Sequence, residues 1–316
     1  MDAPHQFLLV GLPASGKTTF LAALWHVVES NEVDASLRLA TYDGDYAYLN
    51  QIRDKWLRGE AVGRTQTAPR PVHLPLVAQT TVDDAIDNGA TGESFALDIP
   101  DMSGETFRDQ WRSREWTTDF DALARRANGV LFFVHPDIKE SREIADIAIA
   151  VGDTSGAVGD ASGEAGEDSQ DGEEETASAH QVATGKPWTP DESSTQIVAV
   201  ELLQFLRRAA PSGPFSVAVV VSAWDLVPPT LHADEPPVPT RWVEERLPLL
   251  WQYLESNRGD VRWTAFGISA QGGDLESDGF KEGLAGVLDH AERVRVVAET
   301  GHEGHDISAP LVWLLG

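Results

Sequence analysis

The segment Gly11-Leu12-Pro13-Ala14-Ser15-Gly16-Lys17-Thr18 constrains the fold more than any other part of the chain. It fits the pattern G-x-x-x-x-G-K-[ST], whose glycines let the backbone turn so tightly that successive N–H groups point at phosphate oxygens. An apolar stretch over 6–10 precedes it, and apolar residues at helical spacing follow over 19–28. Strand, loop and helix in this order are the context that a phosphate-binding loop requires. We call residues 11–18 the phosphate loop.

The pattern also assigns chemistry to individual residues of this loop. Lys17 is expected to reach the β- and γ-phosphates and to take part in catalysis, and Thr18 is expected to offer its hydroxyl to Mg²⁺. The loop alone does not distinguish ATP from GTP, because small-molecule kinases carry the same kind of loop. The residues expected to bind nucleotide here are Gly11, Ala14, Ser15, Gly16, Lys17, Thr18 and Thr19.

Strand and helix patterns alternate along the rest of the chain. Strands are predicted over 71–78, 94–99, 129–134, 215–221 and 261–268, and helices over 45–57, 106–126, 195–209, 240–256 and 281–297. A polar turn containing Asn88-Gly89 is expected to join the first two of these strands. The alternation predicts an α/β fold, a three-layer α/β/α sandwich with a mostly parallel, doubly wound sheet. We expect one domain over 1–316.

The charge of the chain is strongly negative and partly local. The formal net charge of −27 argues against nucleic acid as a ligand, because its phosphates would be repelled. Residues 153–192 hold eleven acidic residues and one lysine among Gly, Ser and Ala. Such a stretch lacks the apolar content to pack, which predicts a disordered acidic insertion. The alternative is a docking segment for a basic partner.

The sequence contains no pattern typical of a membrane helix or a secretory signal. No apolar run approaches the roughly 20 residues of a membrane helix, and no basic region precedes the first apolar stretch. The chain has no cysteine, which excludes disulfides and thiolate metal sites. These features favour a cytoplasmic protein that does not bind membranes.

A D-x-x-G pattern follows the apolar strand 95–99. Asp101, at the end of this strand, is expected to hold Mg²⁺ through water, and Gly104 permits its N–H to contact the γ-phosphate. The pattern is common by itself, but it gains weight from its position after a strand that would lie beside the phosphate loop.

The strand that ends in Val221-Ser222-Ala223-Trp224-Asp225 resembles that of the Ras-like, TRAFAC-class GTPases, whose guanine motif N/T-K-x-D lies there. The resemblance implies that Asp225 accepts hydrogen bonds from guanine N1 and N2. Ser269 and Ala270 are similar to the S-A-K motif, whose backbone contacts the guanine oxygen. Ser222, Ala223 and Gln271 depart from the two motifs, which puts affinity and base preference in question. The alternative role for Asp225 is a strand-end helix cap.

The resemblance also implies switch residues. The segment Arg64-Thr65-Gln66-Thr67 precedes the strand 71–78, where Ras-like GTPases carry a threonine that completes the Mg²⁺ shell. Thr67 is the first candidate and Thr65 the second. Arg64 would be an internal arginine finger, or else a surface arginine of a polar loop. Glu105 occupies the position of the water-orienting glutamine, and its charge predicts slow hydrolysis.

The run 11–25, the D-G-D-Y sequence at 43–46, D-x-S-G-E at 101–105 and the ending at 305–315 resemble bacterial double-GTPase proteins of predicted conflict or defence gene clusters. The resemblance implies GTP and GDP as ligands, Mg²⁺ as cofactor, and protein partners such as a second GTPase, an effector or a regulator. Two other functions stay open. One is a nucleotide-binding scaffold that does not hydrolyse, and the other is a P-loop small-molecule kinase.

Overall fold

The protein is described from a computed structural model that covers residues 5–40, 45–62, 70–78, 94–101, 104–140, 189–211, 213, 215–228, 236–275, 277–284 and 289–316. Side chains are described in these ranges except at residues 70, 71, 73, 94–101, 278 and 281. The predicted Asn88-Gly89 turn, the segment 64–67 and residues 153–188 of the acidic insertion lie outside the described residues.

The order of helices and strands follows the predicted alternation. The strands are β1 His5–Val10, β2 Leu37–Leu39, β3 Arg70–Ala78, β4 Ser94–Asp101, β5 Gly129–Val134, β6 Phe215–Ser222, β7 Val261–Ser269, β8 Arg295–Val297 and β9 Glu303–Gly304. The α-helices are α1 Lys17–Ser30, α2 Ala47–Leu57, α4 Gly104–Ser113, α5 Thr118–Ala124, α7 Thr195–Ala209, α8 Pro239–Arg246, α9 Pro248–Ser256, α10 Asp278–Leu284 and α11 Ala309–Leu315. Short 3₁₀ turns are η1 Pro190–Glu192, η2 Trp224–Leu226 and η3 His290–Arg293.

All described strands belong to one sheet of order β2-β3-β4-β1-β5-β6-β7-β8-β9. The five central strands, β4, β1, β5, β6 and β7, are parallel to one another. Antiparallel strands flank them on both sides, β3 and β2 beside β4, and β8 and β9 beside β7. The predicted doubly wound sheet is therefore confirmed for its parallel centre, and the sequence analysis missed the short strands β2, β8 and β9.

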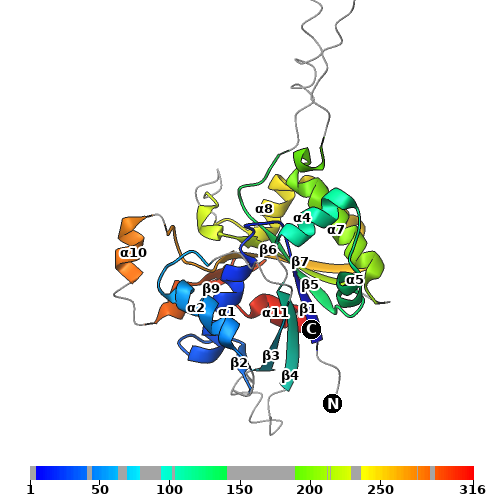
Figure 1. Cartoon of the computed structure of the whole chain (residues 1–316). Helices are drawn as coiled ribbons and strands as arrows, with labels where there is room; N and C mark the ends of the chain where they lie inside the picture. The colour runs from blue at the N-terminus through cyan, green and yellow to red at the C-terminus, as the bar shows by residue number, and fades with distance from the viewer. Residues whose placement is uncertain are drawn as a thin grey trace, which may run out of the picture.

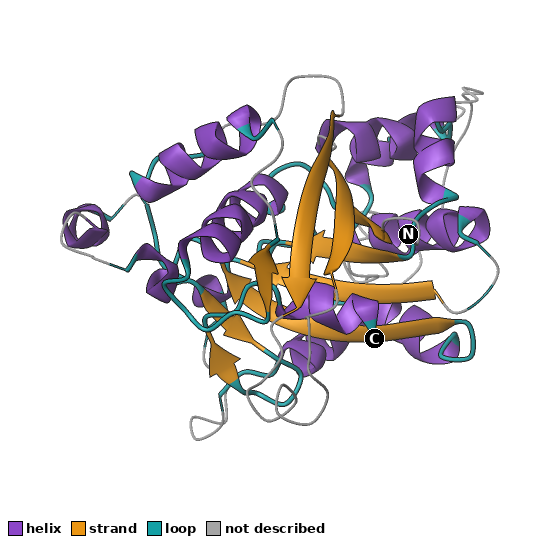
Figure 2. Ribbon diagram, turned by 90° about the horizontal axis from the view of Figure 1, so that it is seen from below, coloured by secondary structure: helices purple, strands orange, loops and turns teal. Residues whose placement is uncertain are grey.

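The central strands are buried on both faces, which explains their continuous apolar sequences. Alternate residues of one strand enter different cores. In β5, Leu131 and Phe133 pack with α1, α2 and α11, whereas Val130 and Phe132 pack with α4, α5, α7, α8 and α9. Figure 1 shows α1 and α2 on one side of the sheet and α4, α5 and α7 on the other. Figure 2 shows the strands between the two helical layers, which confirms the predicted three-layer sandwich.

Parallel pairing brings the carboxyl ends of four strands to one edge of the sheet. Val10 of β1 lies opposite Phe132, Val134 of β5 opposite Val221, and Ser222 of β6 opposite Ile268. The loops that follow these strands are therefore neighbours, although they are far apart in sequence. In open parallel sheets such an edge is where ligands bind.

Two predicted helices are each divided in two. The stretch 106–126 contains α4 and α5, because Arg114 adopts a left-handed φ of 60° and Thr117 then caps the second helix. The stretch 240–256 contains α8 and α9, because Pro248 cannot continue the hydrogen-bond ladder of the first helix. Both corrections concern breaks inside a helical pattern.

The predicted helix over 281–297 is wrong. Among the described residues, the α-helix α10 ends at Leu284, and His290–Arg293 form the 3₁₀ turn η3. Arg295–Val297 form strand β8, which pairs antiparallel with β7. The segment carries three valines in four residues, and Val296 and Val297 are buried on opposite faces of the sheet. β-branched residues that alternate between two cores fit a strand better than a helix.

The end of the acidic stretch is part of the folded body. Residues 190–192 form η1, where Pro190 accepts a hydrogen bond of 2.8 Å from the indole of Trp111. Asp191 forms an ion pair with Arg112 through two hydrogen bonds of 2.6 and 2.7 Å.

Among the described residues, the helices are too short or too polar to cross a membrane.

The 3₁₀ turn η3 is attached to α1 through Glu32. Its carboxylate lies 3.0 Å from His26 Nε2 and accepts the Ala291 N–H at 2.8 Å. Burial alone would raise the pKa of Glu32, but these two hydrogen bonds, with the nearby charges of His26 and His290, lower it below the usual range. The carboxylate therefore stabilises the fold when ionised.

We predict that Glu32→Gln lowers the free energy of unfolding by about 1 kcal/mol at pH 7, because the charge that strengthens both hydrogen bonds is lost. Since the pKa is depressed in the folded state, this difference should disappear as the pH falls below about 4. Urea unfolding at pH 7 and at about pH 3, below the usual pKa of a glutamate, measures the difference under both conditions. Glu282→Gln, on the exposed side of α10, is the control. A difference between wild type and Glu32→Gln that is independent of pH would contradict this account.

Candidate functional site

The phosphate loop adopts a tight turn that its sequence dictates. Gly16, directly before α1, has a left-handed φ of 87°, which favours glycine. A Cβ at Gly11 would lie 2.6 Å from Ser15 Oγ and 2.7 Å from the Phe133 carbonyl. The loop therefore needs glycine at both ends. Gly16 is needed for its backbone conformation, and Gly11 is needed because there is no room for a side chain. It leads into the N-terminus of α1, where unpaired N–H groups and the helix dipole favour an anion.

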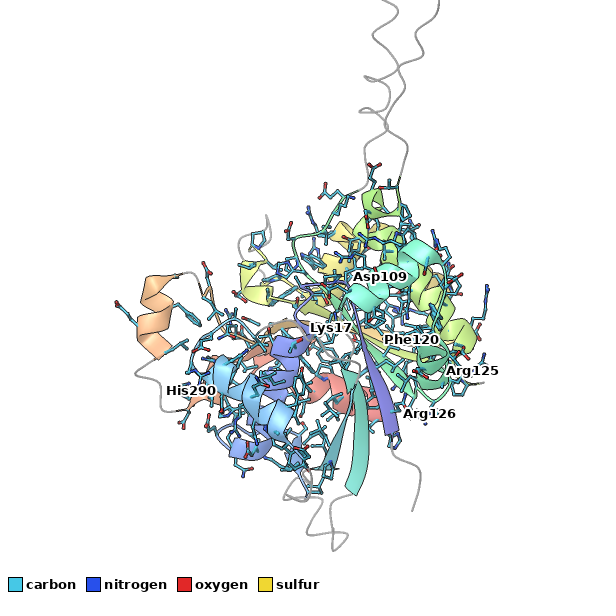
Figure 3. The ribbon with its side chains drawn as sticks, in the orientation of Figure 1. Lys17, Asp109, Phe120, Arg125, Arg126 and His290 are labelled. Carbon is cyan, nitrogen blue, oxygen red and sulfur yellow. The ribbon has the colours of Figure 1, made fainter. Side chains whose placement is uncertain are left out.

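Lys17 is buried within this loop, with 6% of its surface exposed. Its ammonium donates to the carbonyls of Gly11 at 2.7 Å and Leu12 at 3.1 Å, and to Ser15 Oγ at 3.2 Å. Figure 3 shows Lys17 near the centre of the molecule, at the start of α1. A buried cation is costly unless it is paired with oxygen ligands, and phosphate oxygens would satisfy it more strongly than neutral carbonyls.

Helix α4 begins directly against the phosphate loop. A Cβ at Gly104 would lie 2.4 Å from both N and Cα of Pro13, so only glycine permits this approach. One turn later, the ring of Phe107 lies 5.7 Å from Lys17 Nζ. The structure thus brings the glycine of D-x-x-G to the loop, as the motif implies. Glu105 follows Gly104 and is partly exposed.

The structure describes one of the predicted metal ligands in full, another by its backbone alone and the others not at all. Thr18 is the second residue of α1 and is partly exposed. Asp101 is the last residue of β4, beside β1, and only its backbone is described. Thr67, Thr65 and Arg64 lie outside the described residues. Among the described side chains, no group of three or more His, Asp or Glu residues is arranged to hold a metal ion.

A cavity of about 330 Å³ extends from the phosphate loop along the ends of β5, β6 and β7. Its size is at the lower end of the range of small-ligand sites, about 300–1,000 Å³. Its walls unite most of the predicted nucleotide residues with apolar side chains from the segment after α2, from η2 and from the loop after β7. Residues that line it include Ala14, Gly16, Thr19, His135, Ser222, Ala223, Asp225, Ser269, Ala270 and Gln271, with Val62, Leu226 and Leu275 among the apolar ones.

Asp225 and Ser269 form a hydrogen-bonded pair at this cavity. Ser269 Oγ donates to Asp225 Oδ1 and accepts the Gly272 N–H at 3.1 Å. Ser269 is fully buried, whereas Asp225 is exposed. The buried serine therefore holds the exposed carboxylate by one of its two oxygens. This pairing joins η2 to the end of β7.

The two departures from the guanine motif have different structural consequences. Ser222 is buried, donates to the Val134 carbonyl at 3.3 Å, and lies so close to Gly16 that a Cβ there would approach it to 2.8 Å. It thus connects β5, β6 and the phosphate loop. Ala223 adopts a left-handed φ of 46° and presents only a methyl group to the cavity. The smaller side chain leaves this wall apolar.

Trp224 packs inside the protein and does not face this cavity. A Cβ at Gly267 would lie 2.2 Å from its ring, so the indole lies directly on the backbone of β7. Its side chain is 5% exposed. Trp224 is therefore a packing residue of the core.

The sequence analysis missed one residue that the structure connects to the site. Trp56 of α2 donates its indole N–H to the Ala270 carbonyl at 2.9 Å, across 214 residues of sequence. In the sequence it is one more apolar position of an amphipathic helix, and nothing in its spacing marks it as a neighbour of residue 270.

We predict that Gly104→Ala lowers the free energy of unfolding by about 2 kcal/mol, since the added methyl group meets backbone atoms that cannot rotate away. Urea unfolding measures the change. Gly279→Ala on α10, where no atom lies within 4 Å, is the matched control and should be neutral or stabilising. Equal stabilities of the two variants would show that α4 does not touch the loop.

Comparisons with known proteins identify the family of this chain. A search of curated proteins found no match. Among solved structures, the chain is similar to the signal recognition particle receptor SRb-GTP/SRX complex from Chaetomium thermophilum, with 14% identity, coverage of 90% of this chain and 97% of that one, and a TM-score of 0.36. It is also similar to the Arl6 BBS3 small GTPase from Trypanosoma brucei with bound GppNp, with 14% identity, coverage of 90% and 94%, and a TM-score of 0.35. Residues 8–314 match the sequence model of the family Double-GTPase 1. The chain therefore belongs to the Double-GTPase 1 family, and it is a GTP-binding protein.

Proposed function

We propose that the protein is a Mg²⁺-dependent GTPase with slow intrinsic hydrolysis that acts as a nucleotide-controlled switch. One observation carries the proposal. A single cavity joins the phosphate loop, through Ala14 and Gly16, to Asp225, Ser269 and Ala270. A nucleotide that places its phosphates on the loop would therefore have its base beside a carboxylate that is already oriented.

The chemistry of this carboxylate favours guanine. Ser269 fixes Asp225 Oδ1, and guanine offers adjacent N1–H and N2–H donors to the carboxylate. Adenine has no such pair of donors, so Asp225 would be left unpaired beside it, at a cost of about 1–3 kcal/mol. The Ala270 N–H would donate to the guanine oxygen.

The other end of the nucleotide needs cationic and oxygen ligands. Lys17 and the N–H groups of the loop would bind the phosphates, with the N-terminus of α1 behind them. Hydroxyl and carboxylate oxygens suit Mg²⁺, and Thr18 at the start of α1 and Asp101 at the end of β4 have these groups. We propose Thr67 as the third protein ligand. Bound Mg²⁺ would neutralise charge on the β- and γ-phosphates.

Hydrolysis would depend on Glu105 and Arg64. Glu105 begins α4 beside Gly104, which lies against the loop, so its carboxylate would be near the attacking water. A carboxylate accepts a hydrogen bond from that water but also repels the γ-phosphate, which makes hydrolysis slow. Arg64 would supply compensating positive charge, as an internal arginine finger.

The cellular role follows from family membership alone. We propose a cytoplasmic protein with protein partners, a second GTPase, an effector or a regulator, in a bacterial conflict or defence system. A scaffold that binds GTP without hydrolysing it is the second candidate, and the observation that favours it is the acidic residue at 105. Measurement of phosphate release after GTP binding separates the two.

We predict that Asp225→Asn weakens GDP binding by roughly 100-fold, because two hydrogen bonds to a charged group are lost. The same variant should bind xanthosine diphosphate more tightly than wild type, since an amide complements the xanthine oxygen. Competition against a fluorescent nucleotide measures both affinities. Asp274→Asn, at an exposed carboxylate on the same cavity, is the control and should keep the preference for GDP. No change in preference for Asp225→Asn would mean that Asp225 does not contact the base.

Lys17→Ala should abolish binding of every nucleotide, with a loss of roughly 100-fold or more, because it removes the charge that pairs with the phosphates. Isothermal titration with GDP and Mg²⁺ measures the loss, and circular dichroism checks that the variant is folded. Wild-type affinity in a folded Lys17→Ala variant would place the phosphates somewhere else.

Glu105→Gln should raise the single-turnover rate of GTP hydrolysis roughly tenfold, which corresponds to about 1.4 kcal/mol, by removing a negative charge near the γ-phosphate. Phosphate release from a preformed GTP complex measures the rate. A lower rate would instead identify Glu105 as a base, and no release from either protein would support the scaffold.

A further inference from the structure

The loop that follows β7 is held in place by Trp56 and Arg293, two residues that do not line the cavity. Trp56 is fully buried, and its indole donates to the Ala270 carbonyl at 2.9 Å. A buried carbonyl needs a partner, and the Trp56 indole supplies one to Ala270. The position of this residue therefore depends on α2.

Arg293 holds Trp56 from the opposite side. Its guanidinium carbon lies 3.7 Å from the centroid of the indole, and its Nη2 donates to the Trp56 carbonyl. Burial lowers the pKa of Arg293 to about 10, while the charge of Glu32 acts in the opposite direction, so the group is a cation at neutral pH. A cation stacked on tryptophan in a desolvated site is a strong contact.

The same arginine limits where the loop can go. A Cβ at Gly272 would lie 2.3 Å from the Arg293 carbonyl, so the loop rests directly on the backbone of η3. Glu32 in turn joins η3 to the end of α1 through Ala291. The loop is thus clamped between α2 and η3. Its upper side carries Ala270 and Gln271, which line the cavity.

We propose that Trp56 is a positioning residue for base recognition, which holds Ala270 by its carbonyl, so that the N–H of the same residue, in the preceding peptide unit, meets the carbonyl oxygen of a guanine base. The inference rests on the proposed function, because it requires that the base lies between Asp225 and Ala270. It adds that discrimination at the base oxygen is controlled from α2. Trp56 itself does not contact the nucleotide.

The contact also connects two parts of the nucleotide site. α2 ends at Leu57 and leads through Ala61 and Val62, which line the cavity, towards residues 64–67. A base bound at Ala270 would stabilise α2 through Trp56, and a stable α2 would in turn favour the base. Such coupling is reciprocal by thermodynamic necessity.

Trp56→Phe tests the proposal, since it keeps a buried ring and removes only the N–H donor. Without the hydrogen bond Ala270 is no longer held by its carbonyl, so its N–H can leave the position that faces the base. We expect GDP and inosine diphosphate, which both carry the base oxygen, to bind roughly 5- to 30-fold more weakly. The diphosphate of 2-aminopurine riboside lacks that oxygen, so its affinity should stay the same. Competition titrations with the three ligands give the ratios.

Trp25→Phe is the matched control. Trp25 is also fully buried and donates its indole N–H to α2, at Asn50 Oδ1 and 2.9 Å, but it does not contact the base loop. It should leave all three ratios unchanged. If Trp56→Phe does not fold, Arg293→Met keeps an apolar stem on the indole and removes its charge, and it should give the same ligand pattern with a smaller effect.

Three results separate the hypotheses. Equal weakening of all three ligands by Trp56→Phe, or unchanged affinity for all of them, would overturn the positioning role while the guanine site stands. A wild-type protein that binds ADP as tightly as GDP would instead contradict the proposed function. Loss of affinity confined to the ligands with a base oxygen supports the proposal.

Discussion

Parallel pairing of β4, β1, β5, β6 and β7 is the constraint on which the rest of the structure depends. Each parallel pair needs a crossover connection, and the helices in these connections cover both faces of the sheet. Parallel pairing also places the carboxyl ends of all five strands at one edge. Asp101, Gly11, Ser222 and Ser269 are therefore neighbours, although they are spread over more than 250 residues. No local contact could bring them together without this pairing.

The phosphate loop carries local positive charge, whereas the whole chain is strongly acidic. The protein carries a formal charge of −27, yet its binding loop buries a lysine ammonium and directs backbone N–H groups outward from the N-terminus of a helix. A compact cationic site in an acidic protein favours small polyanions that can be enclosed, and it disfavours extended ones that would meet the acidic surface. Helix α4 extends this site. It touches the loop at Gly104, and at its far end Arg112 binds Asp191 and lowers the pKa of that carboxyl.

The sequence predicted most of the sheet and most of the site, because both are encoded locally. The loop pattern, the apolar central strands and the D-x-x-G glycine each have a short signature with a physical reason. The errors have a different origin. Breaks at Arg114 and Pro248 lie inside good helical patterns, and β8 is a strand only because β7 offers it an edge. Trp56 could not be predicted as part of the site, since its role depends on a contact across 214 residues.

The most direct test of the central claim is a crystal structure of the protein with GDP and Mg²⁺. The account predicts phosphates on the loop, with the Lys17 ammonium turned from the carbonyls of Gly11 and Leu12 to the β-phosphate. It also predicts the base in the 330 Å³ cavity, with N1 and N2 on Asp225 and the base oxygen on the Ala270 N–H. A nucleotide bound with its base outside this cavity, or with no hydrogen bond to Asp225, would contradict the account.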